Sequence, residues 1–484
     1  MELQDHGHLI GGERRALGAQ VITVENPATG LPVGRVTAGT AADAAEALDV
    51  ARAAQKAWAR KTPVERGGVL QKAAALLVER AAEIGRIITL EQGKPLDHAT
   101  MEVKGGAGHL QYHSEWARRM TGSVMPSDRP NNRILTTKHP YGVVVAIVPW
   151  NFPVAVLCRK IAPALMAGNA VVVKPSEMTP FSAFRVAEVL KDAGLPDGVL
   201  NIVNGTGPEV GGALVAHPIT QLVTLTGSVG AGQSVMRAAA ENLTVVSLEL
   251  GGKAPFIVME DADVEQAARD VIFARFKNAG QICTCAERVY VHEAVHGAFV
   301  KKVAELAAAL KLGDPLTSPD MGPVISSAQV EKLRAVVAAA RKDGASVVCG
   351  GDRPAGDAFA QGHWFSPTVL SGVSHGGSLT QEEIFGPVLP VVKVASFDEA
   401  VAFANDSDFG LSAYLYTQDF DRIMRAMDEI DFGEIFVNRT GPESVHGYHG
   451  GYRKSGIGGD DGPYGFEAYL KKRTVYLGYR GGEA

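Results

Sequence analysis

The chain has 484 residues, of which 46% are hydrophobic and 21% are charged, so it is long enough for two or more domains and a large core. Its 47 basic and 53 acidic residues give a formal net charge of -6 and are interspersed, which argues against nucleic acid or an anionic membrane as a partner. Apolar runs such as residues 142–148 are much shorter than the ~20 residues of a membrane-spanning helix.

Two further features of the sequence bear on the compartment. Residues 1–6 lack a basic region followed by an apolar one, so no export signal is expected. The 4 cysteines are too few for a disulfide framework in a chain of this length, which suggests a reducing environment. We therefore predict a cytoplasmic protein.

The N-terminal part of the chain predicts short strands followed by helices. Residues up to 36 read as strands and turns. Thr40 with Asp43 starts one helix, and Thr62 with Glu65 forms a capping box with proline at the first helical position, predicting a helix that ends at Gly93. A further helix is expected over residues 101–120.

Residues 122–140 predict a β-hairpin, whose turn lies at residues 128–132. The C-terminal residues 474–479 are strand-like and would pair with it. Because the hairpin has no other partner in the sequence, we predict that it pairs subunits of a homo-oligomer, a dimer or a tetramer.

From residue 142 the pattern alternates between strands and helices. Continuous apolar strands are expected at residues 142–148, 170–173, 200–203 and 222–225, with helices over 153–167 and from a Thr179 cap to Gly194. Such strands are typical of a parallel, doubly wound sheet covered on both faces. A sheet of this kind binds ligands at the carboxyl ends of its strands.

A second α/β region runs from about residue 255 past 394 and contains Cys283. The cysteine lies on a glycine-bearing turn between a helix, Val264–Phe276, and a strand at 288–291. Such a turn exposes a sulfur and places amides beside it, as a nucleophilic thiol requires. Taken alone, the cysteine would equally fit a small buried apolar side chain.

Short motifs elsewhere favour the nucleophile. In chain order they are PWNFP at 149–153, KPSE at 174–177, TGS at 226–228, LELGGK at 248–253, GQIC at 280–283 and EEIFGP at 382–387. Together they resemble the NAD(P)-dependent aldehyde dehydrogenase superfamily over essentially the whole chain. The runs CTCAERVY at 283–290 and YRKSGIGG at 452–459 are similar to its lactaldehyde and glycolaldehyde dehydrogenase branch.

The resemblance implies a domain plan. A discontinuous NAD-binding domain would comprise residues 1–121 and 141–250, and a catalytic α/β domain residues 251–450. Residues 122–140 and 466–484 would form the small β oligomerisation element.

The resemblance also implies the catalytic chemistry. Cys283 would attack the aldehyde, the thiohemiacetal would give hydride to NAD, and water would hydrolyse the thioester. Glu249 would be the general base, and Asn151 with the Cys283 amide would stabilise the oxyanion. As alternatives, Glu249 would be a solvated charge and Asn151 the N-cap of a helix that starts at Pro153. A catalytically silent relative would not need these residues, and a CoA-acylating one would not need the base.

For the cofactor, the resemblance assigns Lys174 and Glu177 to the adenine ribose, and Glu383 and Phe385 to the nicotinamide ribose and ring. A carboxylate at Glu177 would repel a 2'-phosphate, which favours NAD, although Lys174 would attract one and leaves NADP open. Residues 227–232 do not form the G-x-G-x-x-G fingerprint. The implied cofactor-binding set is Trp150, Lys174, Ser176, Glu177, Gly207, Thr226, Gly227, Ser228, Leu250, Gly251, Glu383 and Phe385.

The implied substrate-binding residues are Arg159, Lys277, Thr284 and His449, with Arg439 and His446 in segments near the aldehyde tunnel. In the succinate semialdehyde branch, arginines at the positions of Arg159 and Lys277 bind a carboxylate, but Lys277 lacks the bidentate fork. In the lactaldehyde branch, Arg159 and His449 would contact substrate oxygens. We therefore predict a short polar aldehyde of the lactaldehyde or glycolaldehyde type, with succinate semialdehyde or another short anionic aldehyde as the alternative.

The remaining cysteines and the tail complete the predictions. A regulatory disulfide between Cys283 and Cys285 is conceivable but would be strained, and Cys158 and Cys349 are expected to be buried and inert. No side-chain cluster has metal-ligand spacing. The tail departs from the family at residues 458–461, where many relatives carry arginine and glutamate, and residues 437–444 lack the usual small-residue tunnel wall.

Overall fold

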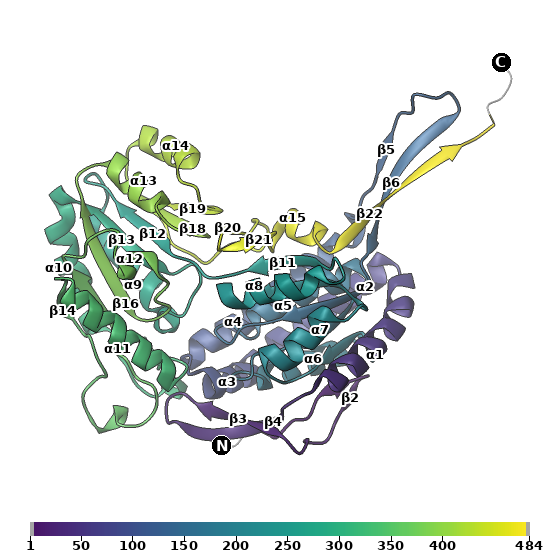
Figure 1. Ribbon diagram of the computed structural model, residues 1–484, viewed down its shortest axis with the longest axis horizontal. Helices are drawn as coiled ribbons and strands as arrows, with labels where there is room; N and C mark the ends of the chain where they lie inside the picture. Colours follow the sequence, from purple (N-terminus) through teal and green to yellow (C-terminus); the bar gives the residue numbers. More distant parts are fainter. Residues whose placement is uncertain (1–3, 481–484) are drawn as a thin grey trace.

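Two largely parallel β-sheets, one in each half of the chain, organise the fold of the computed structural model (Figure 1). The structure describes residues 4–480. The predicted absence of an export signal rests partly on residues 1–3, and the last residues of the predicted oligomerisation element are 481–484, so both lie partly outside the described residues. No helix within residues 4–480 is long and apolar enough to cross a membrane.

The N-terminal helices start where their caps predict. Thr40 and Thr62 each form a complete capping box, with Asp43 and Glu65 respectively. The N-terminal elements are β1 (Leu9–Ile10), β2 (Glu13–Arg14), β3 (Val21–Asn26), β4 (Leu31–Thr37), α1 (Ala41–Arg60), α2 (Pro63–Glu79), α3 (Ala81–Gln92) and α4 (Leu96–Ser114).

Two of the predicted helices were wrong in extent. The expected single helix ending at Gly93 is broken at Arg80, whose φ of -91° and ψ of 11° are not helical, and both α2 and α3 pack on α4. Helix α4 begins at Leu96 rather than near residue 101 and ends at Ser114, before a short 3-10 turn, Glu115–Arg118. Tertiary packing, rather than a glycine or proline, sets the break at Arg80.

The first sheet is the predicted doubly wound one, and apolar clusters cover both of its faces. Its strand order is β2-β1-β9-β8-β7-β10-β11-β21, in which β9 through β11 run parallel. Its elements are β7 (Val143–Ile147), β8 (Ala170–Lys174), β9 (Leu200–Ile202), β10 (Thr220–Thr226), β11 (Val245–Glu249), α5 (Ala155–Ala167), α6 (Phe181–Asp192), α7 (Gly212–Ala216) and α8 (Val229–Ala240). The strand β21 (Gly456–Ile457) returns from the C-terminal part and pairs antiparallel with β11.

Two buried glutamates cap helices of this sheet from a distance. The Glu91 carboxylate accepts hydrogen bonds from the amides of Phe181 (2.7 Å) and Ser182 (3.1 Å), so the predicted Thr179 cap of α6 was wrong. The Glu102 carboxylate likewise accepts from Val154 (2.9 Å) at the start of α5. Carboxylates stabilise helix N-termini because they satisfy amides that have no partner within the helix.

The second sheet has the order β14-β15-β16-β13-β12-β18-β19 and is parallel except for β14. Its strands are β12 (Ala254–Val258), β13 (Ala286–His292), β14 (Ser346–Cys349), β15 (Thr368–Ser371), β16 (Val388–Val394), β18 (Ser412–Tyr416) and β19 (Glu434–Val437). Its helices are α9 (Val264–Phe276), α10 (Glu293–Ala309), α11 (Ser327–Lys342), α12 (Ser378–Gln381), α13 (Phe397–Asn405) and α14 (Phe420–Glu429). The predicted helix before Cys283 matches α9.

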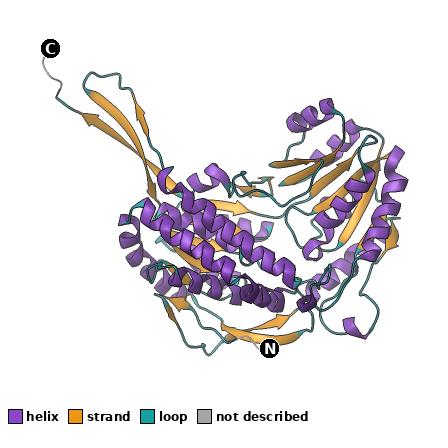
Figure 2. Cartoon of the chain, turned by 180° about the vertical axis from the view of Figure 1, so that it is seen from behind, coloured by secondary structure: helices purple, strands orange, loops and turns teal. Residues whose placement is uncertain are grey.

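A small antiparallel sheet projects from the body of the molecule (Figure 2). It consists of β5 (Ser123–Met125), β6 (Asn132–Pro140) and β22 (Leu470–Gly478). The predicted pairing of the tail with the hairpin is confirmed, because β22 runs along β6 with Thr474 opposite Thr136. Two further short strands, β17 (Phe409–Gly410) and β20 (Tyr452–Arg453), pair with each other, and α15 (Gly462–Glu467) precedes β22.

Candidate active site

A cavity of about 750 Å³ receives side chains from both large sheets and from the C-terminal segment. It is lined by these predicted residues: Trp150, Asn151, Arg159, Thr226, Gly227, Ser228, Glu249, Leu250, Gly251, Lys277, Cys283, Thr284, Glu383, Phe385 and His449. Arg439 and His446, which lie in segments expected near the tunnel, do not line it. The cavity therefore lies where the sequence analysis expected it, at the carboxyl ends of parallel strands.

The loop that carries Cys283 is held in an unusual backbone conformation. After α9, Asn278 (φ 50°), Ala279 (φ 53°) and Gly280 (φ 72°) are successively left-handed. A Cβ at Gly280 would lie 2.3 Å from the carbonyl oxygen of Gly386, so only glycine fits there. Backbone strain of this kind persists where the surrounding structure fixes the conformation. In this conformation of the loop, Cys283 is partly exposed at the cavity.

Asn151 faces this loop. Its Nδ2 donates a hydrogen bond to the carbonyl of Gln281 (3.0 Å), and its own carbonyl accepts from Asn278 Nδ2 (3.1 Å) and Lys94 Nζ (2.9 Å). The alternative role as helix N-cap was wrong, because α5 starts at Ala155 and Glu102 binds its first amides. The side-chain amide carries two N–H groups, so the second is available to an oxygen atom in the cavity.

Replacing Asn151 with alanine is expected to lower kcat by ~100- to 1,000-fold, the usual cost of removing one oxyanion donor. Steady-state kinetics would measure this loss, and dinucleotide binding followed by protein fluorescence serves as the control, because it should change little. A variant that keeps wild-type kcat would show that Asn151 does not stabilise the transition state.

Glu249 is the last residue of β11 and is 3% exposed, so the alternative of a solvated charge does not hold. Neither carboxylate oxygen has a hydrogen-bond partner among the described residues. Burial raises the pKa of Glu249 to about 8, with Asp460 adding to the rise and His449, Lys160 and Arg159 opposing it. A buried carboxylate that lines the same cavity as Cys283 has the properties of a general base for neutral to basic pH.

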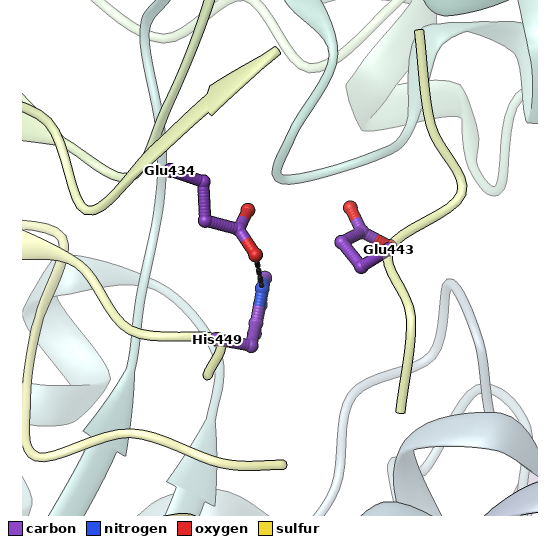
Figure 3. Close-up of side chains that lie close together, drawn as sticks. All are labelled: Glu434, Glu443 and His449. Atoms are coloured by element: carbon purple, nitrogen blue, oxygen red, sulfur yellow. Dashed lines mark hydrogen bonds and ion pairs between the residues drawn. The ribbon is translucent and has the colours of Figure 1, made fainter. Parts of the chain in front are cut away.

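His449 lies close to the base and to two further carboxylates, of which Figure 3 shows Glu434 bound to the ring and Glu443 nearby. Its Nδ1 lies 3.0 Å from Glu434 Oε1 and its Nε2 lies 3.5 Å from Glu249 Oε2. Burial and Arg159 lower the pKa of His449, but the carboxylates of Glu434 and Glu249 and a hydrogen bond with Cys283 raise it well above the usual value. The ring is thus held between two carboxylates at the cavity wall.

Glu434, Glu443 and His449 offer ligand atoms within 4.8 Å of one another. Sequence spacing gave no sign of this group, because the irregular loop after β19 brings Glu443 and His449 back to Glu434. We interpret it as an ion-pair network, since the imidazole of His449 is already bound to Glu434 and its positive charge lowers the pKa of Glu443 against the effect of burial. The prediction that the protein has no metal site stays a prediction.

Arg159 lines the cavity, but its charge has a partner. Its Nε lies 3.0 Å from Asp461 Oδ2, and the Asp461 side chain is 1% exposed. Lys277 Nζ stands 4.7 Å above the ring of Phe273, and its positive charge faces Glu443 and Glu102. Both cationic residues that were predicted to bind substrate, Arg159 and Lys277, therefore lie at the cavity. Acidic groups nearby offset their positive charge.

Some of the predicted cofactor residues line the cavity, and the others lie outside its lining. Ser228 caps α8, whose N-terminus opens at the cavity, and the Glu383 carboxylate accepts from the Gly252 amide at 2.8 Å. The rings of Trp150 and Phe385 meet edge to face, with centroids 5.5 Å apart. Lys174, Ser176, Glu177 and Gly207 lie outside the cavity lining, and Lys174 Nζ at the end of β8 is 3.3 Å from Glu177 Oε2.

These residues fit a nicotinamide dinucleotide. A Cβ at Gly207 or Gly230 would meet open space, so the backbone around Gly207 and the start of α8 is accessible. A helix N-terminus suits a pyrophosphate, and the paired lysine and carboxylate at the end of β8 suit a ribose. The aromatic rings of Trp150 and Phe385 line the cavity together with Glu383.

The other cysteines are not positioned for a disulfide with Cys283. Cys285 is buried, its thiol contacts the Ala274 carbonyl at 2.9 Å, and burial raises its pKa to about 12. Cys158 is buried as expected, but Cys349 is half-buried, so that prediction was wrong. Cys349 sits on the edge strand β14, where one face of the strand meets solvent.

Sequence reasoning missed several residues that hold the site. They are Lys94, Glu102, Glu434, Glu443 and Asp461. Each is a common charged residue without a local motif, and its contacts form only when separate elements fold together. Asp461 and Glu443 had a signal, because they lie in the departures from the family pattern at residues 458–461 and 437–444.

Comparison with known proteins places the chain in a family. Residues 15–475 match the Aldehyde dehydrogenase family. The chain is 44% identical to 3,6-anhydro-alpha-L-galactose dehydrogenase of Streptomyces coelicolor over 94% of this chain and 93% of that protein. It is also 44% identical to lactaldehyde dehydrogenase of Escherichia coli over 94% of this chain and 95% of that protein. A solved structure of 3,6-anhydro-L-galactose dehydrogenase in complex with NAP superposes with a TM-score of 0.96 at 45% identity, covering 98% of this chain and 100% of that one.

The fold and these relatives define an oxidoreductase that uses a nicotinamide dinucleotide. The chain belongs to the aldehyde dehydrogenase family, which confirms the predicted class of enzyme and its fold.

Proposed function

We propose that the enzyme oxidises a short, uncharged, hydroxylated aldehyde of the lactaldehyde or glycolaldehyde type to the carboxylic acid, with NAD as the preferred acceptor. The observation that carries this proposal is the balance of charge at the cavity. Arg159 is paired with Asp461 at 3.0 Å, and His449 with Glu434 at 3.0 Å. Where the arginine and the histidine of the cavity already have carboxylate partners, hydroxyl groups are favoured over a carboxylate.

Cys283 is the nucleophile in this account. Its thiolate sulfur forms a bond to the aldehyde carbon, the carbonyl π bond breaks, and the oxygen becomes an alkoxide that accepts hydrogen bonds from Asn151 Nδ2 and the Cys283 amide. When bound, the dinucleotide supplies the acceptor for the hydride that leaves this carbon. The product on the protein is then a thioester of Cys283.

Glu249 completes the turnover. Its carboxylate takes a proton from water as the water oxygen attacks the thioester carbon, and the Cys283 sulfur leaves. The adjacent His449 ring, whose Nε2 lies 3.5 Å from Glu249 Oε2 and whose pKa the surrounding carboxylates raise, favours the thiolate that is released. A buried base is effective here because burial raises its proton affinity into the working pH range.

One observation supports NAD over NADP. The carboxylate of Glu177 lies beside Lys174, which reduces the positive charge available to a 2'-phosphate. The solved relative in complex with NAP argues for the phosphorylated cofactor, so activity with both dinucleotides should be compared.

The proposal extends to assembly and location. The sheet of β5, β6 and β22 exposes Val124, Val475, Tyr476 and Leu477, and apolar side chains on a projecting sheet suit pairing with another subunit. We propose a homo-oligomer on this basis. A cytoplasmic location rests on the small number of cysteines.

The test is a side-by-side measurement of kcat/KM for L-lactaldehyde, glycolaldehyde and succinate semialdehyde with NAD and with NADP. We expect the better hydroxyaldehyde to exceed succinate semialdehyde by more than ~100-fold, equivalent to ~2.7 kcal/mol of transition-state stabilisation. A preference for succinate semialdehyde would instead mean that Arg159 and Lys277 bind a carboxylate, which is the alternative function.

A further inference from the structure

Two adjacent cations on α5 are matched by two adjacent aspartates of the C-terminal segment. Asp460 Oδ2 accepts from Lys160 Nζ at 2.9 Å, and Asp461 Oδ2 lies 3.0 Å from Arg159 Nε. Of the two cations, Arg159 lines the cavity and Lys160 does not. The aspartates therefore perform the same ionic pairing, but only Asp461 pairs with a residue that can contact substrate.

Asp461 is held firmly in this position. It is buried, and its second oxygen, Oδ1, lies 3.1 Å from His109 Nδ1. Burial raises the pKa of Asp461, but Arg159 and His109 outweigh it and keep the pKa well below the usual range. Asp461 therefore remains a carboxylate at every pH at which the enzyme would work.

A substrate carboxylate that approached Arg159 would meet competing anions. Asp461 already occupies one edge of the guanidinium, and Glu443 adds a negative charge to the environment of Arg159. An anionic ligand would have to displace Asp461 or share the arginine with it, and like charges at this distance repel. A hydroxyl or carbonyl oxygen can accept from the same guanidinium without that repulsion.

We propose that Asp461 is a specificity-determining residue, which neutralises Arg159 and so excludes aldehydes that carry a carboxylate. The inference rests on the proposed oxidation of aldehydes at Cys283. The inference goes beyond the proposed function, because it assigns the choice between neutral and anionic aldehydes to the ion pair of Arg159 and Asp461. Asp461 itself lies outside the cavity lining.

The test variant is Asp461→Asn. The backbone of Asp461 has φ 60° and ψ 168°, a region strained for any residue with a side chain, so asparagine meets the same strain as aspartate while it keeps the size of the side chain. Asp461→Gly is a second variant in case the first folds poorly, because glycine adopts the same backbone freely. Asp460→Asn is the matched control, since it removes the same charge one residue away but faces Lys160.

The readout is the ratio of kcat/KM for succinate semialdehyde to that for glycolaldehyde, with saturating dinucleotide. In Asp461→Asn we expect this ratio to rise by at least ~10-fold, mainly through a lower KM for succinate semialdehyde, because Arg159 would gain a free edge. Asp460→Asn should change it by less than ~3-fold, since Lys160 does not reach the cavity. Adding Arg159→Gln to the Asp461→Asn variant should abolish the gain.

Three other results would have distinct meanings. If both substrates change in parallel in both Asp461 variants, Asp461 is only structural and the inference is overturned. A gain that survives Arg159→Gln would overturn it as well. If the wild-type enzyme already prefers succinate semialdehyde, the proposed function fails, whereas the response of the ratio to Asp461→Asn still decides the inference.

Discussion

Replacing Cys283 with alanine is expected to abolish aldehyde oxidation while dinucleotide binding persists. Loss of the nucleophile in covalent catalysis lowers kcat by on the order of 10⁴- to 10⁶-fold, because the remaining groups cannot form the intermediate. Cys283 lies at the cavity on a loop with left-handed residues that present its side chain, and no other described cysteine lines the cavity. The measurement is dinucleotide reduction at saturating aldehyde, with binding followed by fluorescence.

The matched control is Cys285→Ser. Cys285 is two residues away but buried, with its thiol bound to the Ala274 carbonyl, so this variant should retain most of the activity. Substantial oxidation by Cys283→Ala, or loss of activity in the control alone, would contradict the assignment of the nucleophile.

Replacing Glu249 with glutamine is expected to slow steady-state turnover by ~100- to 10,000-fold, the range typical of a general base. The first hydride transfer should survive better than later turnovers, because Glu249 is needed most when water attacks the thioester. Rapid-mixing measurements should therefore show a burst of reduced dinucleotide followed by a slow phase. Glu241→Gln, at an exposed glutamate, is the control and should behave as wild type.

The same residue predicts a dependence on pH. Because burial raises the pKa of Glu249 to about 8, the basic form is lost as the pH falls below that value. Deacylation should therefore slow by roughly tenfold per pH unit below pH ~8 and level off above it. A pH profile that is flat from 6 to 9, or a slope that persists in Glu249→Gln, would show that another group is the base.

The main features of the fold were predictable because they depend on local patterns. Continuous apolar strands between helices predicted the parallel sheet, and the capping boxes at Thr40 and Thr62 fixed two helix starts. Cys283, Glu249 and Asn151 stand within short motifs that keep their order along the chain. The structure brings these three residues to one cavity, as the motifs required.

The parts that could not be predicted depend on contacts between distant residues. Glu91 caps α6 from 90 residues away, and Asp460 binds Lys160 across 300 residues, so no local signal identifies either pair. The break at Arg80 has no glycine or proline to mark it, because it arises from packing on α4. The charge balance around Arg159 likewise appears only when the tail is folded against α5.

The central claim is that the aldehyde carbon becomes bonded to Cys283 and leaves by hydrolysis that depends on Glu249. Mass spectrometry of the Glu249→Gln variant, after incubation with glycolaldehyde and NAD, tests this most directly. We predict an acyl group on Cys283, located by peptide fragmentation, that requires the dinucleotide and remains when Cys285 is also changed to serine. An unmodified Cys283 peptide, or an acyl group on a different residue, would contradict the account.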